Sequence, residues 1–444
     1  MFINREKEKA QINNLITKKG FEFAVFYGRR RVGKTRLILE CIREKKHIYY
    51  LAVEKDNIRY FVSKVSQTFP EVKNFKEDWE VIIDFLKDKI DILVIDEFQN
   101  LAKEDKNLLS IFQRIVDTSL KNSNLKFFVL GSSISLISSY VLSEPSPLYG
   151  RKTFSSKIIP LEFFHLSEFF PKSDFIELAC IYGFADGMPY YLEKIKTPFW
   201  QWLDKELKFP TFVKDELNFM IKYEFEEVGT YKLILEAIAN GKATTGEIKD
   251  FAKLQRTDVS FYLSKLLETE FIERRVPLTE REKSKLGRYF IKDQFIAFWF
   301  KFIQPNLSSI EEGIFSSKNI EKQYPQYMGF VFEKICKQLL VKMIKENQFT
   351  YDKIGNWWHK DVEIDLIAIN EEEKEALFIE CKWEDDVNAQ SILELLKEKT
   401  KHFEWNNKVR KEKFAIFARS FKNKEGIGED VLLFDIEDMG KRLK

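Results

Sequence analysis

The sequence has few cysteines, no long apolar run and almost no net charge, and each shortage excludes a class of protein. Its four cysteines (Cys41, Cys180, Cys336, Cys381) are scattered over 444 residues, which argues against a disulfide framework and against zinc-ligand spacing. No apolar segment is long enough to span a bilayer, and the charged N-terminus lacks the apolar core of a signal peptide. We therefore expect a cytoplasmic protein with free thiols and no membrane contact.

The formal net charge is only +2, from 72 basic and 70 acidic residues. A chain without a strong overall field can contact nucleic acid only through local basic patches. Hydrophobic residues make up 44% and charged residues 32%, which is a globular composition. The length favours about three domains.

Residues 28–35 follow the phosphate-loop pattern of Gly, four free positions, then Gly-Lys-Thr. An apolar strand at 21–27 precedes the loop, and a helix continuing through 36–42 carries a favourable N-terminus for anions. Lys34 can reach the β- and γ-phosphates, and the Thr35 hydroxyl can ligate magnesium. The alternative is a structural turn with an accidental lysine. The pattern predicts an ATP and Mg²⁺ site built from Gly28, Arg29, Arg30, Val32, Gly33, Lys34, Thr35 and Arg36.

A second apolar strand, residues 91–98, carries Asp96 and Glu97 at its end. Asp96 would hold magnesium and Glu97 would polarise the attacking water, unless the two acids belong to a solvated turn. Another strand at 126–131 ends in Ser132 and Ser133, which either sense the γ-phosphate or cap the next helix. With further strands at 47–53 and 157–161, the pattern predicts a parallel α/β sheet covered on both faces.

These motifs, in this order, resemble the archaeal and bacterial ATPase family within the AAA-type and signal-transducing P-loop group. The resembling stretches are residues 2–8, 28–35, 94–99, 130–133, 147–151 and 187–192. The resemblance implies that Arg151 acts on the γ-phosphate as an arginine finger. It also implies that Pro189 belongs to a helical lid over the adenine, and that Arg5 helps to form the same pocket.

From residue 230 the pattern changes to three short helices, at 231–239, 245–253 and 257–270, followed by a hairpin of 271–276 and 287–291. This order predicts a winged helix-turn-helix that contacts double-stranded DNA, mostly through its phosphates. The alternative is a packing or protein-contact unit, because the third helix begins with Asp258 and has few base-reading side chains. The cations available for phosphates are Lys253, Arg256, Lys265, Arg274, Arg275, Lys283 and Lys285.

A second chemical site is predicted near the C-terminus, where strand 362–369 returns as strand 376–383. If Ile369 pairs with Ala376, Asp365 lies opposite Glu380 and Glu363 lies opposite Lys382, all on one face. Two acids and a lysine suit magnesium-dependent phosphate chemistry, and Glu333 on a preceding helix is a further candidate ligand. The alternative is a surface hairpin without catalytic function, stabilised by a Glu363–Lys382 ion pair.

Asp365, Glu380 and Lys382, with Glu333 as helix acid, resemble the restriction-endonuclease-like PD-(D/E)xK superfamily. Ile364 stands where the proline usually precedes the first acid. We expect a P-loop ATPase domain (1–165), a helical lid (166–225), a winged helix (226–315) and a nuclease-like α/β domain (316–444). The predicted function is ATP-regulated DNA processing, with Lys382 catalytic and Glu333, Asp365 and Glu380 binding metal. The alternative is an ATP-driven signalling switch on an inactive nuclease scaffold. The sequence leaves the oligomeric state open.

Overall fold

The computed structural model describes residues 3–209, 211–425, 427–428 and 430–443. The chain divides into two compact units. The first comprises the residues up to Pro160 together with Met188–Tyr190. The second comprises Leu161–Gly187 and the residues from Tyr191 onward. The expected boundaries at 166, 226 and 316 therefore all fall inside the second unit.

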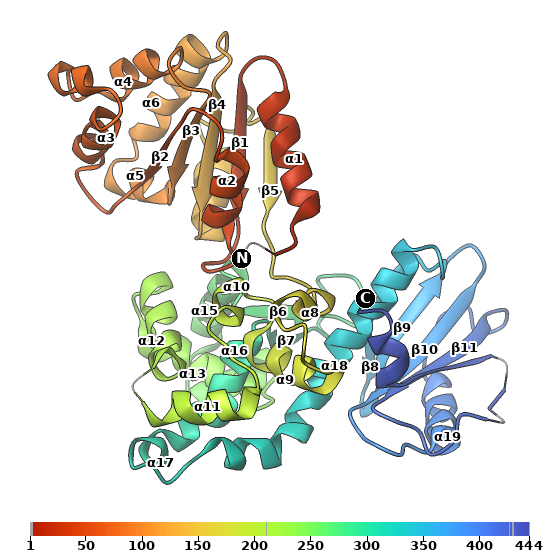
Figure 1. Ribbon diagram of the computed structural model, residues 1–444. Helices are drawn as coiled ribbons and strands as arrows, with labels where there is room; N and C mark the ends of the chain where they lie inside the picture. Colours follow the sequence, from red (N-terminus) through yellow and green to blue (C-terminus); the bar gives the residue numbers. More distant parts are fainter. Residues whose placement is uncertain (1–2, 210, 426, 429, 444) are drawn as a thin grey trace. The chain divides into compact units, whose positions relative to one another are not determined.

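The first unit contains a parallel sheet (Figure 1) that has, among the described residues, five strands in the order β2-β3-β4-β1-β5. Every neighbouring pair is parallel. All carboxyl ends therefore meet at one edge of the sheet, where ligands bind in such folds. The strands are β1 (Glu22–Tyr27), β2 (His47–Leu51), β3 (Ile92–Asp96), β4 (Lys126–Gly131) and β5 (Phe154–Lys157).

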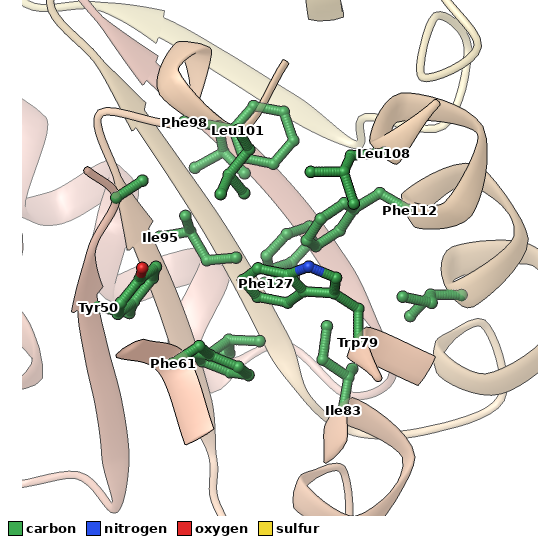
Figure 2. Packing of buried hydrophobic residues seen from close by; sticks show 14 of the residues in the cluster. Tyr50, Phe61, Trp79, Ile83, Ile95, Phe98, Leu101, Leu108, Phe112 and Phe127 are labelled. Atoms are coloured by element: carbon green, nitrogen blue, oxygen red, sulfur yellow. The ribbon is translucent and has the colours of Figure 1, made fainter. Parts of the chain in front are cut away.

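Stacked aromatic side chains fill the core on one face of this sheet (Figure 2). Trp79 stacks on Phe61 with 4.7 Å between ring centroids, and Phe112 stacks on Phe127 of β4 at 5.9 Å. This packing holds β3 and β4 in place, and both strands lead into predicted site residues. The α-helices of the unit are α1 (Glu6–Thr17), α2 (Lys34–Ile42), α3 (Asn57–Ser66), α4 (Trp79–Leu86), α5 (Gln99–Glu104), α6 (Leu108–Ile115) and α7 (Ile134–Ile137).

The fifth strand lies earlier in the chain than the sequence pattern predicted. The apolar run 157–161 was expected to form it, but β5 spans Phe154–Lys157. Among the described residues this strand pairs with β1 alone, and its exposure alternates along the chain. An edge strand needs no continuous apolar run. The apolar residues 157–161 therefore indicated a strand position after the true one.

The second unit begins with helices, as expected of the segment interpreted as a lid. They are α8 (Leu166–Phe169), α9 (Phe175–Ala185), α10 (Pro189–Leu192, shared between the units), α11 (Phe199–Lys208) and α12 (Phe212–Glu224). Three more helices and an antiparallel hairpin follow in the predicted order: α13 (Val228–Ala239), α14 (Thr245–Ala252), α15 (Arg256–Glu268), β6 (Ile272–Arg275) and β7 (Arg288–Ile291). Helices α16 (Gln294–Phe298) and α17 (Leu307–Glu311) complete this part.

The C-terminal part of the second unit is a mixed sheet in the order β12-β11-β10-β9-β8. Strands β8, β9 and β10 are antiparallel, whereas β10, β11 and β12 are parallel. Its elements are α18 (Ser317–Lys345), β8 (Lys353–His359), β9 (Val362–Asn370), β10 (Glu375–Lys382), α19 (Ala389–Thr400), β11 (Lys411–Ala418), β12 (Val431–Phe434) and α20 (Ile436–Gly440). All four cysteines are free. In the part of the chain that is described, no helix is long and apolar enough to cross a membrane.

Candidate functional site

The glycine-rich loop joins β1 to α2 at the carboxyl edge of the parallel sheet. Gly28 has a φ of 151° and Gly33 a φ of 92°, a region that side chains strongly disfavour. A Cβ atom on Gly28 would also lie 2.2 Å from the Ile158 carbonyl oxygen. Glycine at position 28 is therefore required by both conformation and space.

Lys34 lies inside this loop and is 6% exposed. Its Nζ donates hydrogen bonds to the carbonyl oxygens of Gly28 at 2.8 Å and Arg29 at 3.0 Å. Among the other predicted loop residues, Arg29 and Val32 are buried, Arg30 is half-buried and Arg36 is exposed. The ammonium group thus sits among backbone groups that could cradle phosphate oxygens.

Thr35 and Asp96 are brought together from α2 and β3, as the magnesium prediction requires. The Thr35 hydroxyl donates to Asp96 Oδ2 at 2.5 Å, and Asp96 is 2% exposed. A hydroxyl and a carboxylate side by side are oxygen ligands that suit magnesium. Tyr49 on β2 also donates to Asp96 Oδ2, at 2.8 Å. Burial, followed by the charge of Asp96, raises the pKa of Tyr49, so the phenol stays a proton donor. Sequence reasoning missed Tyr49.

Glu97 is held by two side chains from neighbouring elements. The Ser132 hydroxyl after β4 donates to Glu97 Oε2 at 2.6 Å, and Gln99 Nε2 donates to the same oxygen. Ser132 therefore contacts the proposed water-activating acid, while Ser133 precedes α7 without a side-chain cap hydrogen bond. Gln99 was not identified from the sequence, although it follows Glu97 by two residues.

Arg5 and Pro189 both lie against the phosphate loop. Arg5 is 6% exposed and donates through Nη2 to the Val32 carbonyl at 3.1 Å. The Pro189 Cγ lies 3.7 Å from the position that a Cβ on Gly33 would occupy. The guanidinium of Arg31 lies 4.1 Å from the centre of the Tyr190 ring. The 188–190 segment is thus part of the loop surroundings.

Arg151 lies near the amino ends of the strands, whereas the phosphate loop lies at their carboxyl ends. The backbone N–H of Thr153 donates a hydrogen bond to the carbonyl oxygen of Phe23, near the start of β1. Arg151 precedes Thr153 by two residues. The five residues from Phe23 to Gly28 span roughly 17 Å of strand. The Arg151 guanidinium instead forms a bidentate pair with Asp117, with an Nη2–Oδ2 distance of 2.9 Å. It therefore does not reach a nucleotide on its own loop.

Several cations predicted to touch DNA phosphates already have partners within the chain. Lys265 pairs with Glu268 at 2.9 Å, Arg274 donates to the carbonyl oxygens of Glu282 and Ser284, and Arg275 Nε donates to Glu273 at 2.7 Å. The side chain of Arg256 lies outside the described residues, as does Phe2. The exposed predicted cations are Lys253, Lys283 and Lys285.

The loop that joins β6 to β7 packs against strand β8 of the C-terminal sheet. The Leu278 N–H donates to the Asn356 carbonyl at 3.0 Å, and the Trp358 indole N–H donates to the Leu286 carbonyl at 3.1 Å. Arg288 lies over the Trp358 ring, 4.7 Å from its centre. This hairpin loop is therefore a docked element, which the sequence analysis did not foresee.

Strands β9 and β10 have the register predicted from the sequence, with Ile369 paired to Ala376. Extending that register places Asp365 beside Glu380, and Asp365 Oδ2 accepts the Cys381 backbone N–H at 2.7 Å. Burial, and then the charge of Glu380, raise the pKa of Asp365 to about 7. Two carboxylates are thus crowded at the point where the pairing of β9 with β10 ends.

Glu380 is buried and accepts hydrogen bonds from two lysines, Lys382 Nζ at 2.8 Å and Lys399 Nζ at 2.9 Å. Burial opposes protonation of Lys382, but Glu380 raises its pKa. Lys382 thus pairs with Glu380 and not with Glu363, which was the alternative. Glu363 Oε2 lies 3.6 Å from Arg288 Nη1 instead. Lys399 on α19 was missed, because no local spacing connects it to residue 380.

Glu333 approaches these acids from the other face of the sheet. Its helix α18 packs against β10 through Phe332 and Trp383, 5.1 Å between ring centroids, whereas Lys399 on α19 bonds Glu380 from the opposite face. Burial, and then the charge of Asp365, raise the pKa of Glu333. Over the described ranges, no three acidic, histidine or cysteine side chains gather closely enough to hold a metal ion. The role of Glu333 as a further metal ligand therefore stays a prediction.

Two family descriptions match separate parts of the chain. Residues 2–195 match an ATPase domain predominantly from Archaea. Residues 299–400 match archaeal and bacterial proteins of unknown function. The first match covers the parallel sheet and its loop, and the second ends within α19.

One protein is similar to this chain in sequence along its whole length, and one solved structure is similar to it in fold. An uncharacterized protein of Methanocaldococcus jannaschii, MJECL04, is 52% identical over 443 residues, which is 99% of this chain and all of that one. The solved structure of the Walker-type ATPase PABY2304 of Pyrococcus abyssi shares 20% identity with a TM-score of 0.55. The alignment covers 68% of this chain and 96% of that one, and it shows a shared fold.

Proposed function

Because the chain belongs to the family of the M. jannaschii protein and carries the archaeal P-loop ATPase domain, we propose that it binds and hydrolyses ATP with Mg²⁺. The observation that supports this proposal best is the convergence of Lys34, Thr35 and Asp96 at the carboxyl edge of the sheet. These are the lysine, hydroxyl and carboxylate that P-loop enzymes use.

Each residue has a distinct role in this proposal. Lys34 would exchange its bonds to the Gly28 and Arg29 carbonyls for β- and γ-phosphate oxygens. Thr35 and Asp96 would hold the magnesium ion, which neutralises charge on the phosphates. Glu97 would accept a hydrogen bond from the attacking water, oriented by Ser132 and Gln99.

Replacing Lys34 with alanine tests nucleotide binding directly. We expect roughly a 10- to 100-fold loss of ATP affinity in calorimetry, because charge-assisted hydrogen bonds to phosphate are lost. Lys46→Ala serves as the control, since Lys46 is exposed on the same domain. Equal ATP affinity for wild type and Lys34→Ala would exclude the loop as the binding site.

The wider proposal is ATP-regulated processing of double-stranded DNA, with the helix–hairpin segment acting as a winged helix and the C-terminal sheet as a nuclease-like domain. The supporting observations are the order of elements from α13 to β7, the order from α18 to β11, and the neighbouring carboxylates of Asp365 and Glu380. Lys382, bound to Glu380, is the candidate for acting on water and phosphate.

A second function is favoured by other contacts. Glu380 is neutralised by two lysines, the hairpin loop is docked, and α15 exposes Asp258 and Phe261. These features suit a signalling switch in which the C-terminal domain is a scaffold. The two functions differ in one property that can be measured, which is metal-dependent cleavage of DNA.

Metal binding by the full chain, without nucleotide, separates these functions. If Asp365 and Glu380 bind Mg²⁺ or Mn²⁺, saturating metal should raise the unfolding temperature, because it relieves the repulsion between buried carboxylates. Each kcal/mol of binding free energy corresponds to about 2 °C in a unit of this size. We expect Asp365→Asn to lose the shift and Lys382→Ala to keep it while losing cleavage of plasmid DNA.

Asp361→Asn, in the exposed turn before β9, is the matched control. Thr35→Ala removes a metal ligand of the phosphate loop, so a shift that persists in this variant arises elsewhere. If neither metal changes the unfolding temperature and plasmid DNA stays intact with and without ATP, the scaffold function is correct.

A further inference from the structure

A cavity of about 570 Å³ lies within the second unit, between the β6–β7 hairpin, helix α18 and strand β8. Hairpin residues Val276, Pro277 and Leu278 form an apolar wall. Its volume falls in the range of about 300–1,000 Å³ that is usual for ligand pockets. The cavity also reaches Glu333 and Asn356, and the Asn356 side chain donates to the backbone carbonyl of Asp365 at 2.6 Å.

Four cations line this cavity, and three of them have anionic partners. Arg275 pairs with Glu273, Lys292 with Glu270, and Lys334 with Asp186 at 2.8 Å. Lys337, the fourth, has neither a hydrogen bond nor an ion pair within the described residues, although it is half-buried. Glu333 lies one helical turn away, where such pairs commonly form, but does not pair with it.

The surroundings of Lys337 favour an anion. Burial, and then the charge of Arg275, lower the pKa of Lys337, so two cations repel each other in a partly dry cavity. A half-buried ammonium without a direct partner is costly, and the Glu273 carboxylate, which acts to raise the pKa of Lys337, is already bound to Arg275. A phosphate group would give Lys337 a direct partner and could also contact the guanidinium of Arg275, because ammonium and guanidinium are its usual protein partners.

Phe330 adds the second feature of the cavity. It is 68% exposed on α18 and lines the same cavity as Lys337. An exposed aromatic ring beside cations is the combination on which single-stranded nucleic acids stack their bases. A duplex, whose major groove alone is about 12 Å wide, is too large to enter a cavity of this volume.

We propose that this cavity binds one nucleotide unit of a single nucleic-acid strand, with its phosphate on Lys337 and Arg275 and its base against Phe330. The strand would then continue past Asn356 toward Asp365. The phosphate site is inferred from the residues that line the cavity. The path of the strand toward Asp365 rests on the proposed nuclease function.

The test measures binding of a fluorescent oligothymidylate to the full chain, without nucleotide, over a range of salt concentrations. Lys337→Gln should weaken binding and reduce the salt slope by about 0.7, the value for one phosphate contact in a single strand. Lys337→Arg should restore both. Phe330→Ala should weaken binding by roughly 5- to 150-fold without changing the slope. Lys322→Gln, exposed on the same helix, should have no effect.

Three results would overturn the proposal. An unchanged salt slope in Lys337→Gln would show that Lys337 contacts no phosphate. Full competition by inorganic phosphate, with no effect of Phe330→Ala, would show a site for free phosphate compounds. Equal, Lys337-dependent affinity for a matched duplex would show that the strand need not be single. If the wild-type protein binds the strand in this way but cleaves no DNA with either metal, the nuclease function fails while the binding site stands.

Discussion

ATP hydrolysis should fall by about 10²–10⁴-fold when Glu97 is replaced with glutamine, while ATP binding persists. The range is that of general base catalysis. Glutamine keeps the size of the side chain but cannot hold or polarise the attacking water as a carboxylate does. Thr35 and Asp96 remain in place, so the magnesium ligands are unaffected. Phosphate release at saturating ATP measures turnover, and calorimetry measures binding.

The control is Glu54→Gln, an exposed glutamate of the same domain. Ser132→Ala offers a graded comparison, because it removes a 2.6 Å hydrogen bond to Glu97 but leaves the carboxylate. It should reduce turnover less than Glu97→Gln does. Wild-type turnover in Glu97→Gln would assign the water-activating role to another group.

Arg151→Ala is expected to reduce turnover by roughly 10³–10⁵-fold, the contribution of an arginine finger, provided that the enzyme acts as an assembly. Arg151 lies at the amino end of β5, so it can reach only a nucleotide bound to a different copy. An arginine supplied in trans makes turnover depend on protein concentration. Mixing Arg151→Ala with Lys34→Ala should therefore restore activity, because one mixed contact combines an intact loop with an intact arginine.

Lys152→Ala is a suitable control for the loss of a neighbouring positive charge. If the mixture stays inactive and turnover is independent of protein concentration, Arg151 is structural. Its role is then the bidentate pair with Asp117, which fixes the segment before β5 to the π-helix Val116–Leu120. The unfolding temperature of Arg151→Ala would fall in that case.

The parts of the site that sequence predicted are those fixed by strand order and local spacing. Parallel strands place their carboxyl ends together, so Asp96, Glu97 and Ser132 could be expected near the phosphate loop. The β9–β10 register followed from the short turn that joins the two strands. The first arrangement follows from the parallel order of the strands, and the second from a short stretch of chain.

The parts that sequence could not predict depend on side chains from distant elements. Tyr49 reaches Asp96 from a neighbouring strand, and Lys399 reaches Glu380 from a helix nineteen residues later. Glu333 could be named as a further candidate ligand, but the sequence does not show which face of the sheet its helix covers. The partners of such side chains depend on how distant elements pack together, and a local sequence motif does not specify that packing.

The docked hairpin loop also has a consequence for the order of events during protein synthesis. Leu278 and its partner Asn356 are separated by 78 residues (356 − 278). At roughly 5–20 residues per second, the ribosome adds Asn356 about 4–16 seconds after Leu278. The nascent hairpin therefore waits with Leu278 and the Leu286 carbonyl unpartnered, and the C-terminal sheet must form before the segment preceding it can finish folding.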